Sequence, residues 1–135
     1  MVALRVLIAD DESLARERLK TFLSREPGLA LVAECTNGEE AVIEIRRTHP
    51  EVVFLDVQMP GMDGFELCTR MRATAENRTT PIIFVTSLTD FKSRAKSTLS
   101  GGTDLIAKPF MFIELSVKAL THVLRGRMAQ KRQAA

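Results

Sequence analysis

Five side chains in the sequence have the types needed for phosphoryl-transfer chemistry: Asp10, Asp11, Asp56, Thr86 and Lys108. Three carboxylates at one place repel each other and raise each other's pKa unless a cation is present. Ligation by carboxylate oxygens, with water completing an octahedron, is typical of Mg²⁺, whereas zinc would favour His or Cys. A carboxylate, a lysine, a hydroxyl and Mg²⁺ match phosphoryl transfer, in which catalysis is mostly positioning and neutralisation of charge.

In this chemistry Asp56 is the nucleophile and forms an acyl phosphate. A metal ion on Asp10 and Asp11 would neutralise two phosphoryl oxygens, and Lys108 and the Thr86 hydroxyl would bind the others. Each residue alone is a weak indication, since a carboxylate at a strand end is more often a helix cap or a turn former. The hypothesis therefore depends on elements that bring all five side chains together.

Short apolar segments that predict β-strands lead into these residues. Residues 52–55 form an unbroken apolar run, typical of a strand buried on both faces, and Asp56 ends it. The other predicted strands are 5–9, 29–35, 82–85 and 105–107. Four of the five strands therefore end in the polar side chains of the hypothesis.

Amphipathic helices are predicted between the strands and after the last one. The apolar positions that mark them are Ala15, Leu19, Phe22 and Leu23 in the first helix, Ala41, Val42 and Ile45 in the second, Leu67, Cys68 and Met71 in the third, Phe91, Ala95 and Leu99 in the fourth, and Ile113, Val117, Leu120 and Leu124 in the fifth. Their spacing is that of the apolar face of a helix. Asp63 and Asp90 are placed to start the third and fourth helices.

This alternation of strands and helices predicts an α/β fold, a flavodoxin-like doubly wound sheet of five parallel strands with five helices. Short right-handed crossovers favour the strand order 2-1-3-4-5, which makes strands one and three neighbours at the topological switch point. Parallel strands have their carboxyl ends at one edge of the sheet, where ligands bind. The five polar residues are expected at that edge.

Length and composition indicate one ordinary domain over 1–125, followed at 126–135 by a basic tail or the beginning of a linker. Cys35 and Cys68 form no CxxC pair and follow no secretory leader, so we expect a reducing, cytoplasmic location. A net charge of +2 is too small to indicate direct binding of nucleic acid. No apolar run approaches the ~20 residues of a membrane span, so no membrane partner is expected.

The motifs resemble those of the receiver domain of two-component response regulators, in the CheY-like superfamily. They are Asp10-Asp11-Glu12, Asp56 within Leu-Asp-Val-Gln-Met-Pro-Gly-Met-Asp-Gly, Thr86-Ser87 and Lys108-Pro109-Phe110. The resemblance covers nearly the whole chain, and the joint order and spacing of the motifs are highly specific. It implies that Asp56 accepts phosphate from a phosphohistidine, with Mg²⁺ bound by Asp11, Asp56 and the backbone carbonyl of Gln58. It also implies that Asp10 holds the metal through water and that the Lys108-Pro109 bond is cis.

The resemblance further implies a signalling switch, which catalyses only its own phosphorylation and slow dephosphorylation. Its expected partners are a sensor histidine kinase or a histidine phosphotransfer protein, and a downstream protein or a covalently linked output domain. Phosphorylation is expected to draw the Thr86 hydroxyl toward the phosphate and to repack the face made by helix four, strand five and helix five. A homodimer through that face is a further candidate.

Two positions depart from the family pattern. Leu105 stands where an aromatic residue is usual, three positions before the lysine, and Ser87 stands where Ala is usual. Leucine cannot make the aromatic swing that accompanies the movement of Thr86, so the output face is either biased toward one state or uses another reporter.

Three other functions remain as alternatives. A phosphorylation-independent scaffold of the same fold typically lacks an acid or the lysine, whereas this chain keeps both and only Leu105 favours that alternative. A hydrolase of the haloacid dehalogenase type wants a second Asp two residues after the first, where this chain has Gln58. A flavodoxin-like electron carrier would repel its flavin phosphate at Asp10-Asp11-Glu12 and would have no Trp or Tyr to stack on the ring.

Some polar residues near the motifs are interpreted as structural. Asp63 is expected to start a helix and Asp104 to lie in a turn, and His49 and His122 are expected on helices away from the acidic edge. Glu12 fits either the outer sphere of the metal or the positive end of the first helix dipole, and both alternatives remain open.

Overall fold

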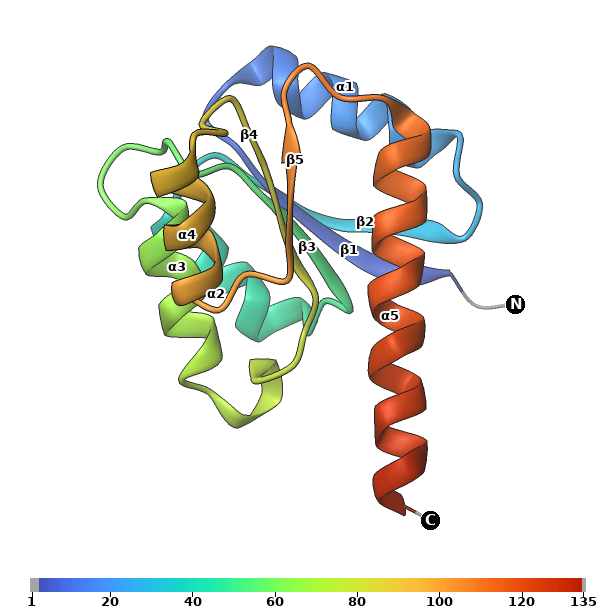
Figure 1. Cartoon of the computed structure of the whole chain (residues 1–135). Coiled ribbons are helices and arrows are strands. Elements are labelled where there is room, and N and C mark those ends of the chain that lie inside the picture. The colour runs from blue at the N-terminus through green and yellow to red at the C-terminus, as the bar shows by residue number, and fades with distance from the viewer. Residues whose placement is uncertain (1–2, 135) are drawn as a thin grey trace.

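One parallel sheet organises the molecule in the computed structural model, which describes residues 3–134 (Figure 1). The strands are β1 (Leu4–Ala9), β2 (Leu29–Cys35), β3 (Val52–Leu55), β4 (Ile82–Thr86) and β5 (Asp104–Ala107). All neighbouring strands pair in parallel, in the order β2-β1-β3-β4-β5. The predicted fold class and strand order are confirmed.

Helices cover both faces of the sheet. They are α1 (Ser13–Ser24), α2 (Gly38–Thr48), α3 (Gly64–Arg72), α4 (Phe91–Leu99) and α5 (Phe112–Ala134), with a short 3₁₀ helix, η1 (Ala75–Asn77), after α3. In Figure 1, α1 and α5 lie on one side of the sheet and α2, α3 and α4 on the other. This arrangement leaves the ends of the strands open between the two layers of helices.

The core consists of two apolar clusters, one on each face of the sheet. Val53 and Leu55 of β3 lie in the cluster that also contains side chains of α2 and α3, whereas Val52 and Phe54 lie in the cluster with α1 and α5. Successive residues of a strand point to opposite faces, so a strand covered on both sides is apolar throughout. The unbroken run before Asp56 follows from this double burial.

Side chains cap the starts of three helices, at the predicted Asp63 and Asp90 and also at Asn37. Asn37, Asp63 and Asp90 each accept a hydrogen bond from the backbone N–H three residues later, at 2.7 to 2.8 Å. These caps satisfy N–H groups that have no partner within the helix. Because α3 begins directly after Asp63, its cap also fixes the end of the loop that follows Asp56.

The apolar faces predicted for α4 and α5 do not pack on the sheet. Phe91 and Leu99 of α4 are 88% and 86% exposed, and Ser97 is the buried residue of that helix. The four positions expected on the apolar face of α5 are exposed as well, while Leu115, Ala119 and Val123 are buried. α5 carries two apolar stripes of helical spacing, and periodicity alone does not tell which of them the sheet covers.

Two further observations concern the end of the sheet and the end of the chain. Asp104 is the first residue of β5, not a turn residue as expected, because its N-terminal neighbours Gly101 and Gly102 make the turn. α5 continues without a break across the expected boundary between residues 125 and 126. No helix within residues 3–134 is long and apolar enough to cross a membrane.

Candidate functional site

Three carboxylates meet at the carboxyl edge of the sheet. Asp10 follows β1 and Asp56 follows β3, and these two strands pair directly. An oxygen from each of Asp10, Asp11 and Asp56 lies within 4.8 Å of the others. Asp10 is 1% and Asp56 3% exposed, whereas Asp11 is exposed. The predicted acidic cluster is therefore formed, with one member open to solvent.

Lys108 reaches the same cluster from the end of β5. Its Nζ lies 2.7 Å from Oδ2 of Asp10, 3.6 Å from Oδ2 of Asp56 and 3.2 Å from Oε1 of Glu12. Burial lowers the pKa of Lys108, but the hydrogen bond to Asp10 and the charges of Asp56 and Asp10 outweigh it and raise that pKa above its usual value. The lysine is a fixed cation of the site. The Lys108-Pro109 peptide bond is cis, as the resemblance implied.

The carboxyl group of Asp56 has an elevated pKa. Burial and the charge of Asp10 raise it from 3.8 to about 6, against the opposing effects of Lys108, the N–H of Val57 and the Thr86 hydroxyl. That N–H donates a hydrogen bond of 2.8 Å to Oδ1 of Asp56. At neutral pH Asp56 is mainly ionised and carries a nucleophilic oxygen in a largely dry site. Any added cation there would relieve its repulsion with Asp10.

Thr86 and Leu105 lie on one face of the sheet, beside the cluster. Thr86 is fully buried at the end of β4, and its Oγ1 accepts a hydrogen bond of 3.2 Å from the N–H of Leu88. Thr86 is paired with Ala107 and Phe84 with Leu105, so Leu105 lies two residues from Thr86 along the same face. Leu105 is 7% exposed and belongs to the apolar cluster on the α3 side. The two predicted switch residues are neighbours.

The donor set of the cluster fits Mg²⁺. Carboxylate oxygens are the hard ligands that Mg²⁺ prefers, and the exposed Asp11 leaves room for the waters that this ion retains. Three carboxylates and one lysine leave the site with a net negative charge, which a divalent cation would offset. The backbone carbonyl of Gln58 as a further ligand, and water between Asp10 and the metal, remain predictions.

Gly64 is a residue of the site that the sequence pattern did not single out beyond its place at a helix start. A Cβ at this position would lie 2.3 Å from the backbone oxygen of Asp56 and 2.9 Å from Cα of Val57. The N–H of Gly64 donates a 2.9 Å hydrogen bond to the carbonyl of Val57. The start of α3 is therefore packed against the backbone of Asp56, and this needs a residue without a side chain.

Glu12 has a role that neither of its two alternatives included. Glu12 directly precedes α1, but its side chain makes no hydrogen bond to the start of that helix. Its carboxylate accepts a hydrogen bond from Lys108. His49 ends α2 in the left-handed region, with φ of 48°, and pairs with Glu76. His122 lies on α5 against Asp104. Neither histidine reaches the acidic edge, as expected.

Two hollows border the cluster. One, of about 360 Å³, opens beside Lys108 and is lined by Glu12, Leu14, Arg18, Ser87 and Phe110 among others. The second, of about 380 Å³, lies beside Gln58 and is bordered by residues of the β3–α3 loop and the start of α4. The hollows therefore adjoin the cluster through Lys108 and Gln58, and Asp56 itself lines neither of them.

Comparison with known proteins agrees with this site. The family model described as the response regulator receiver domain matches residues 6–120. An uncharacterised response regulatory protein of Yersinia pestis is 40% identical over 122 residues, 90% of this chain and 49% of that protein. The transcriptional regulatory protein ResD of Bacillus subtilis is 36% identical over 118 residues, 86% of this chain and 47% of that protein. The chain spans about half or less of the length of the curated relatives that it matches.

Solved structures share both the fold and the sequence pattern. A response regulator from Chloroflexus aurantiacus has a TM-score of 0.85 and 31% identity, over 91% of this chain and 99% of that chain. The signal receiver domain of a signal transduction histidine kinase from Syntrophus aciditrophicus has a TM-score of 0.80 and 32% identity, over 90% of each chain. From the acidic edge, the sheet order and these matches together, this chain belongs to the family of response regulator receiver domains.

Proposed function

We propose that this receiver domain accepts a phosphoryl group on Asp56 from the phosphohistidine of a sensor kinase or a histidine phosphotransfer protein. The observation that carries the proposal is the position of Asp56: it is 3% exposed, clustered with Asp10 and Asp11 within 4.8 Å, and 3.6 Å from the ammonium group of Lys108. Such a site combines a carboxylate nucleophile with groups that neutralise phosphoryl charge.

In the transfer, an Oδ atom of Asp56 forms a bond to phosphorus while the bond from phosphorus to the donor imidazole breaks. The electron pair of the broken bond stays on the imidazole nitrogen. The second Oδ of Asp56 is oriented by the N–H of Val57. Lys108 holds a positive charge where the phosphoryl oxygens arrive, and the Thr86 hydroxyl keeps its own hydrogen to donate, since its oxygen only accepts from the N–H of Leu88.

Mg²⁺ held by Asp10, Asp11, Asp56 and the Gln58 carbonyl would neutralise negative charge on the phosphoryl group. Asp10 already bonds to Lys108 and to the N–H of Glu12, so water between Asp10 and the metal is consistent with its contacts. Asp11 is the exposed acid and is free to turn toward an ion that arrives from solvent. Asp10 and Asp56 are therefore buried and hydrogen-bonded within the protein, whereas Asp11 is exposed on the side from which an ion would arrive.

Phosphorylation would act on the face made by α4, β5 and α5. A dianionic group on Asp56 adds hydrogen-bond acceptors, and Thr86 is the nearest buried hydroxyl on the adjacent strand. Movement of Thr86 would change the packing of Leu105, which lies on the same face of the sheet. α4 is the element with the weakest anchor, since its buried residue is a serine. The bistable element is therefore α4 with the neighbouring end of β5.

The donor protein would approach over the hollow beside Lys108, whose rim includes the exposed side chain of Leu14. The output would be a separate protein or a further domain of a longer chain. We propose a signalling role in the cytoplasm, with no enzymatic activity beyond the phosphorylation and slow dephosphorylation of Asp56. The presence of all three acids, the lysine and the buried hydroxyl at the site favours turnover of phosphate over a scaffold that never binds it.

The proposal is tested by the intact mass of the protein after incubation with acetyl phosphate, with and without Mg²⁺. The wild type should gain the mass of one phosphoryl group only when Mg²⁺ is present, and Asp56→Asn should gain none. Asp63→Asn is the matched control, because asparagine caps a helix as well as aspartate does and this residue lies outside the cluster.

Two outcomes would overturn the proposal. A folded wild-type protein that gains no phosphate would support the scaffold alternative, with Leu105 as the first position to examine. A phosphate that still appears on Asp56→Asn would assign the nucleophile to another residue.

A further inference from the structure

Arg16 of α1 joins the acidic edge of the sheet to the outer strand β2. Its Nη1 donates a 2.9 Å hydrogen bond to the backbone carbonyl of Asp10, and its Nε donates a 3.0 Å hydrogen bond to Oε2 of Glu34 on β2. The Arg16 side chain is only 16% exposed. Because a guanidinium group is planar, two contacts of this kind fix its orientation. Arg16 is therefore a rigid link between β2 and the turn that follows β1.

The backbone of Asp10 lies where the sheet ends. Its N–H donates a 3.1 Å hydrogen bond to the carbonyl of Cys35, the last residue of β2. The paired part of β1 and β2 ends with Ala9 and Cys35, so the carbonyl of Asp10 lies beyond the ladder. Arg16 supplies to this carbonyl, from a side chain, the donor that further strand pairing would supply.

The hydrogen bond from Arg16 fixes the path of the chain into Asp11. The carbonyl of Asp10 belongs to the planar peptide group that joins Asp10 to Asp11. Asp11 is the exposed member of the acidic cluster, and no hydrogen bond or ion pair within residues 3–134 holds its carboxylate. The direction of the Asp11 side chain therefore depends on the backbone that Arg16 holds.

We infer that Arg16 is a positioning residue for the metal site: it holds the peptide between Asp10 and Asp11 so that the Asp11 carboxylate stays near those of Asp10 and Asp56. The inference rests on the proposed function, because it concerns the site at which Mg²⁺ is proposed to bind. It adds a residue outside that site on which the metal affinity depends. Arg16 contacts a backbone oxygen of the site and none of its three carboxylates, so it acts only through geometry.

The charge of Arg16 has a smaller effect on the site than its geometry. A cation beside the acidic cluster would by itself weaken the binding of a divalent ion. Glu34 offsets this charge, since its carboxylate lies 3.0 Å from Arg16 and 3.3 Å from Lys20. Lys108 differs in this respect, because its Nζ lies against the carboxylates of the cluster themselves.

Lysine at position 16 separates geometry from charge. It would keep the positive charge, but one ammonium group cannot reproduce the planar fork that binds Glu34 and the Asp10 carbonyl together. Removal of a group that orients a metal ligand typically weakens metal binding by about 10- to 100-fold. Since lysine can still make one of the two contacts, we expect Arg16→Lys to weaken Mg²⁺ binding by about tenfold.

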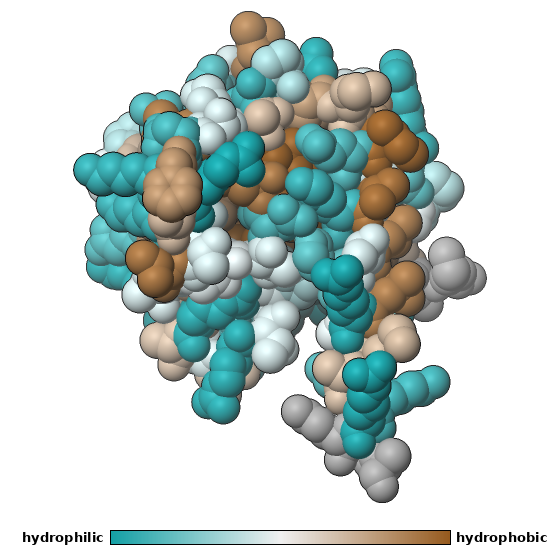
Figure 2. All heavy atoms as spheres, in the orientation of Figure 1, coloured by the Kyte–Doolittle hydropathy of each residue, from teal (hydrophilic) through white to brown (hydrophobic). Residues whose placement is uncertain are grey.

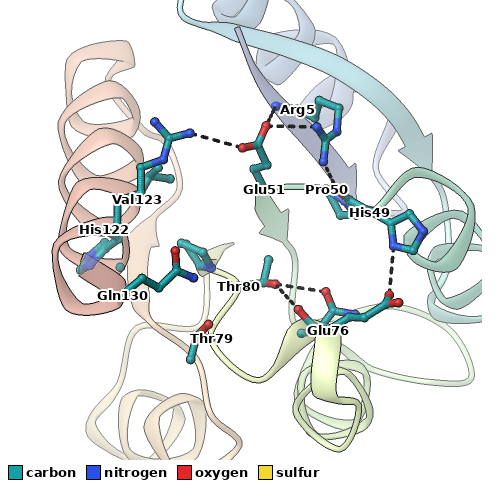
Figure 3. A pocket seen from close by; sticks show the side chains of 14 residues that line it. Arg5, His49, Pro50, Glu51, Glu76, Thr79, Thr80, His122, Val123 and Gln130 are labelled. Atoms are coloured by element: carbon teal, nitrogen blue, oxygen red, sulfur yellow. Dashed lines mark hydrogen bonds and ion pairs between the residues drawn. The ribbon is translucent and has the colours of Figure 1, made fainter. Parts of the chain in front are cut away.

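Arg5 offers a matched control at the opposite edge of the sheet. Like Arg16, it binds one carboxylate and one backbone carbonyl: Nη1 lies 3.5 Å from Oε1 of Glu51, and Nη2 donates a 2.6 Å hydrogen bond to the carbonyl of His49. Figure 3 shows Arg5 and Glu51 beside a cleft of about 290 Å³. Figure 2 shows mainly hydrophilic side chains around the end of α5 that borders this cleft. Arg5→Lys therefore disturbs the same kind of contact away from the acidic edge.

Calorimetric titration with Mg²⁺ tests the inference on the unphosphorylated protein. Arg16→Lys should bind Mg²⁺ about tenfold more weakly than the wild type, and Arg5→Lys should match the wild type within about twofold. A second readout needs no metal. In the metal-free protein the backbone amide signal of Asp11 should shift in Arg16→Lys and stay in place in Arg5→Lys, as measured by ¹H–¹⁵N correlation spectra.

The rate of phosphorylation by acetyl phosphate separates positioning from a loss of folded protein. In Arg16→Lys the Mg²⁺ concentration that gives half of the maximal rate should rise by about tenfold. The rate at saturating Mg²⁺ should stay near that of the wild type, because Asp56, Thr86 and Lys108 are unchanged. A smaller folded fraction would instead lower the rate at every Mg²⁺ concentration.

Glu34→Ala is a second variant, which leaves Arg16 in place and removes the carboxylate that orients its guanidinium group. Its Mg²⁺ affinity should fall by less than that of Arg16→Lys. Equal affinities in the wild type and both variants would overturn the inference alone, and so would an equal loss in Arg5→Lys. A wild type that binds no Mg²⁺ would overturn the proposed metal site and the inference with it.

Discussion

The ammonium nitrogen of Lys108 lies closer to Asp10, at 2.7 Å, than to the acceptor Asp56, at 3.6 Å. Lys108 is therefore the counterion of Asp10, the acid that we expect to hold the metal through water. A phosphoryl group on Asp56 would offer it a more highly charged partner. In the proposed function, Lys108 would thus compete with Mg²⁺ before phosphorylation and bind the phosphoryl group after it.

The first prediction concerns this competition. Lys108→Met should bind Mg²⁺ roughly tenfold more tightly than the wild type, because a positive charge within ~4 Å of the ligands is removed. It should at the same time be phosphorylated more slowly by acetyl phosphate, because that charge no longer stabilises the transition state. Calorimetric titration measures the affinity, and Lys118→Met, a lysine bound to Asp104, is the control. Unchanged Mg²⁺ affinity would show that Lys108 does not compete.

The second prediction is a pH dependence of stability that Asp56 causes. Its pKa is about 6 in the folded protein and about 3.9 when unfolded, so the folded state holds this proton more tightly. The free energy of unfolding should therefore fall as the pH rises from about 4 to about 6 and stay level above that range. At neutral pH the ionised group would cost up to about 3 kcal/mol.

Asp56→Asn removes that cost. Without Mg²⁺, the variant should melt about 5 to 10 °C higher than the wild type at pH 7.5, with the difference disappearing near pH 4.5. Thermal melts followed by circular dichroism over this range are the measurement. Addition of Mg²⁺ should narrow the gap by stabilising only the wild type. A difference that does not vary with pH would rule out ionisation of Asp56 as its cause.

The third prediction concerns the close contact between α3 and the acceptor. Gly64→Ala should destabilise the fold by about 1 to 3 kcal/mol, because its methyl group would overlap the backbone of Asp56 and Val57. It should also slow phosphorylation by displacing Asp56. Gly126→Ala is the matched control: nothing lies within 4 Å of a Cβ there, and alanine favours the helix. If both variants melt alike, the contact at Gly64 is less tight than its geometry indicates.

Much of this site was predictable because parallel strands end at one edge. Once residues 52–55 are identified as a buried strand, the neighbouring position of β1 follows from the handedness of the crossovers, and with it the meeting of Asp10 and Asp56. The pairing of Glu12 with Lys108 was not predictable. It depends on side-chain positions across residues far apart in the sequence, and either of two other roles suited its place before α1 equally well.

The orientation of the outer helices was the other part that the sequence pattern could not determine. In α5, Ile113, Val117 and Leu120 have helical spacing, as Leu115, Ala119 and Val123 do, yet only the second set is buried. The smaller alanine lets the helix approach the sheet closely, a preference that arises only from tertiary packing. In α4 the same effect places Ser97 inward and leaves Phe91 and Leu99 in solvent.

The last prediction concerns transmission from Thr86. Thr86→Ala should still be phosphorylated to nearly the wild-type extent, because Asp56 and its acidic neighbours remain. The Ala side chain has no hydroxyl to donate to the phosphate and no oxygen to accept from the N–H of Leu88, so the response of α4 and β5 should be lost. Amide chemical shifts at Leu105 and along α4, measured with and without acetyl phosphate and Mg²⁺, report that response.

Thr86→Ser is the control for this variant, because it keeps the hydroxyl and loses only a methyl group. It should keep most of the chemical-shift change at Leu105 and α4.

Leu105→Ala tests the next step: it should cost about 2 to 4 kcal/mol of stability, since the side chain is 7% exposed within the core. It should also reduce the shift changes in α4 while leaving those around Thr86 intact. If α4 responds fully in Thr86→Ala, the signal reaches it by a route that does not pass through the Thr86 hydroxyl.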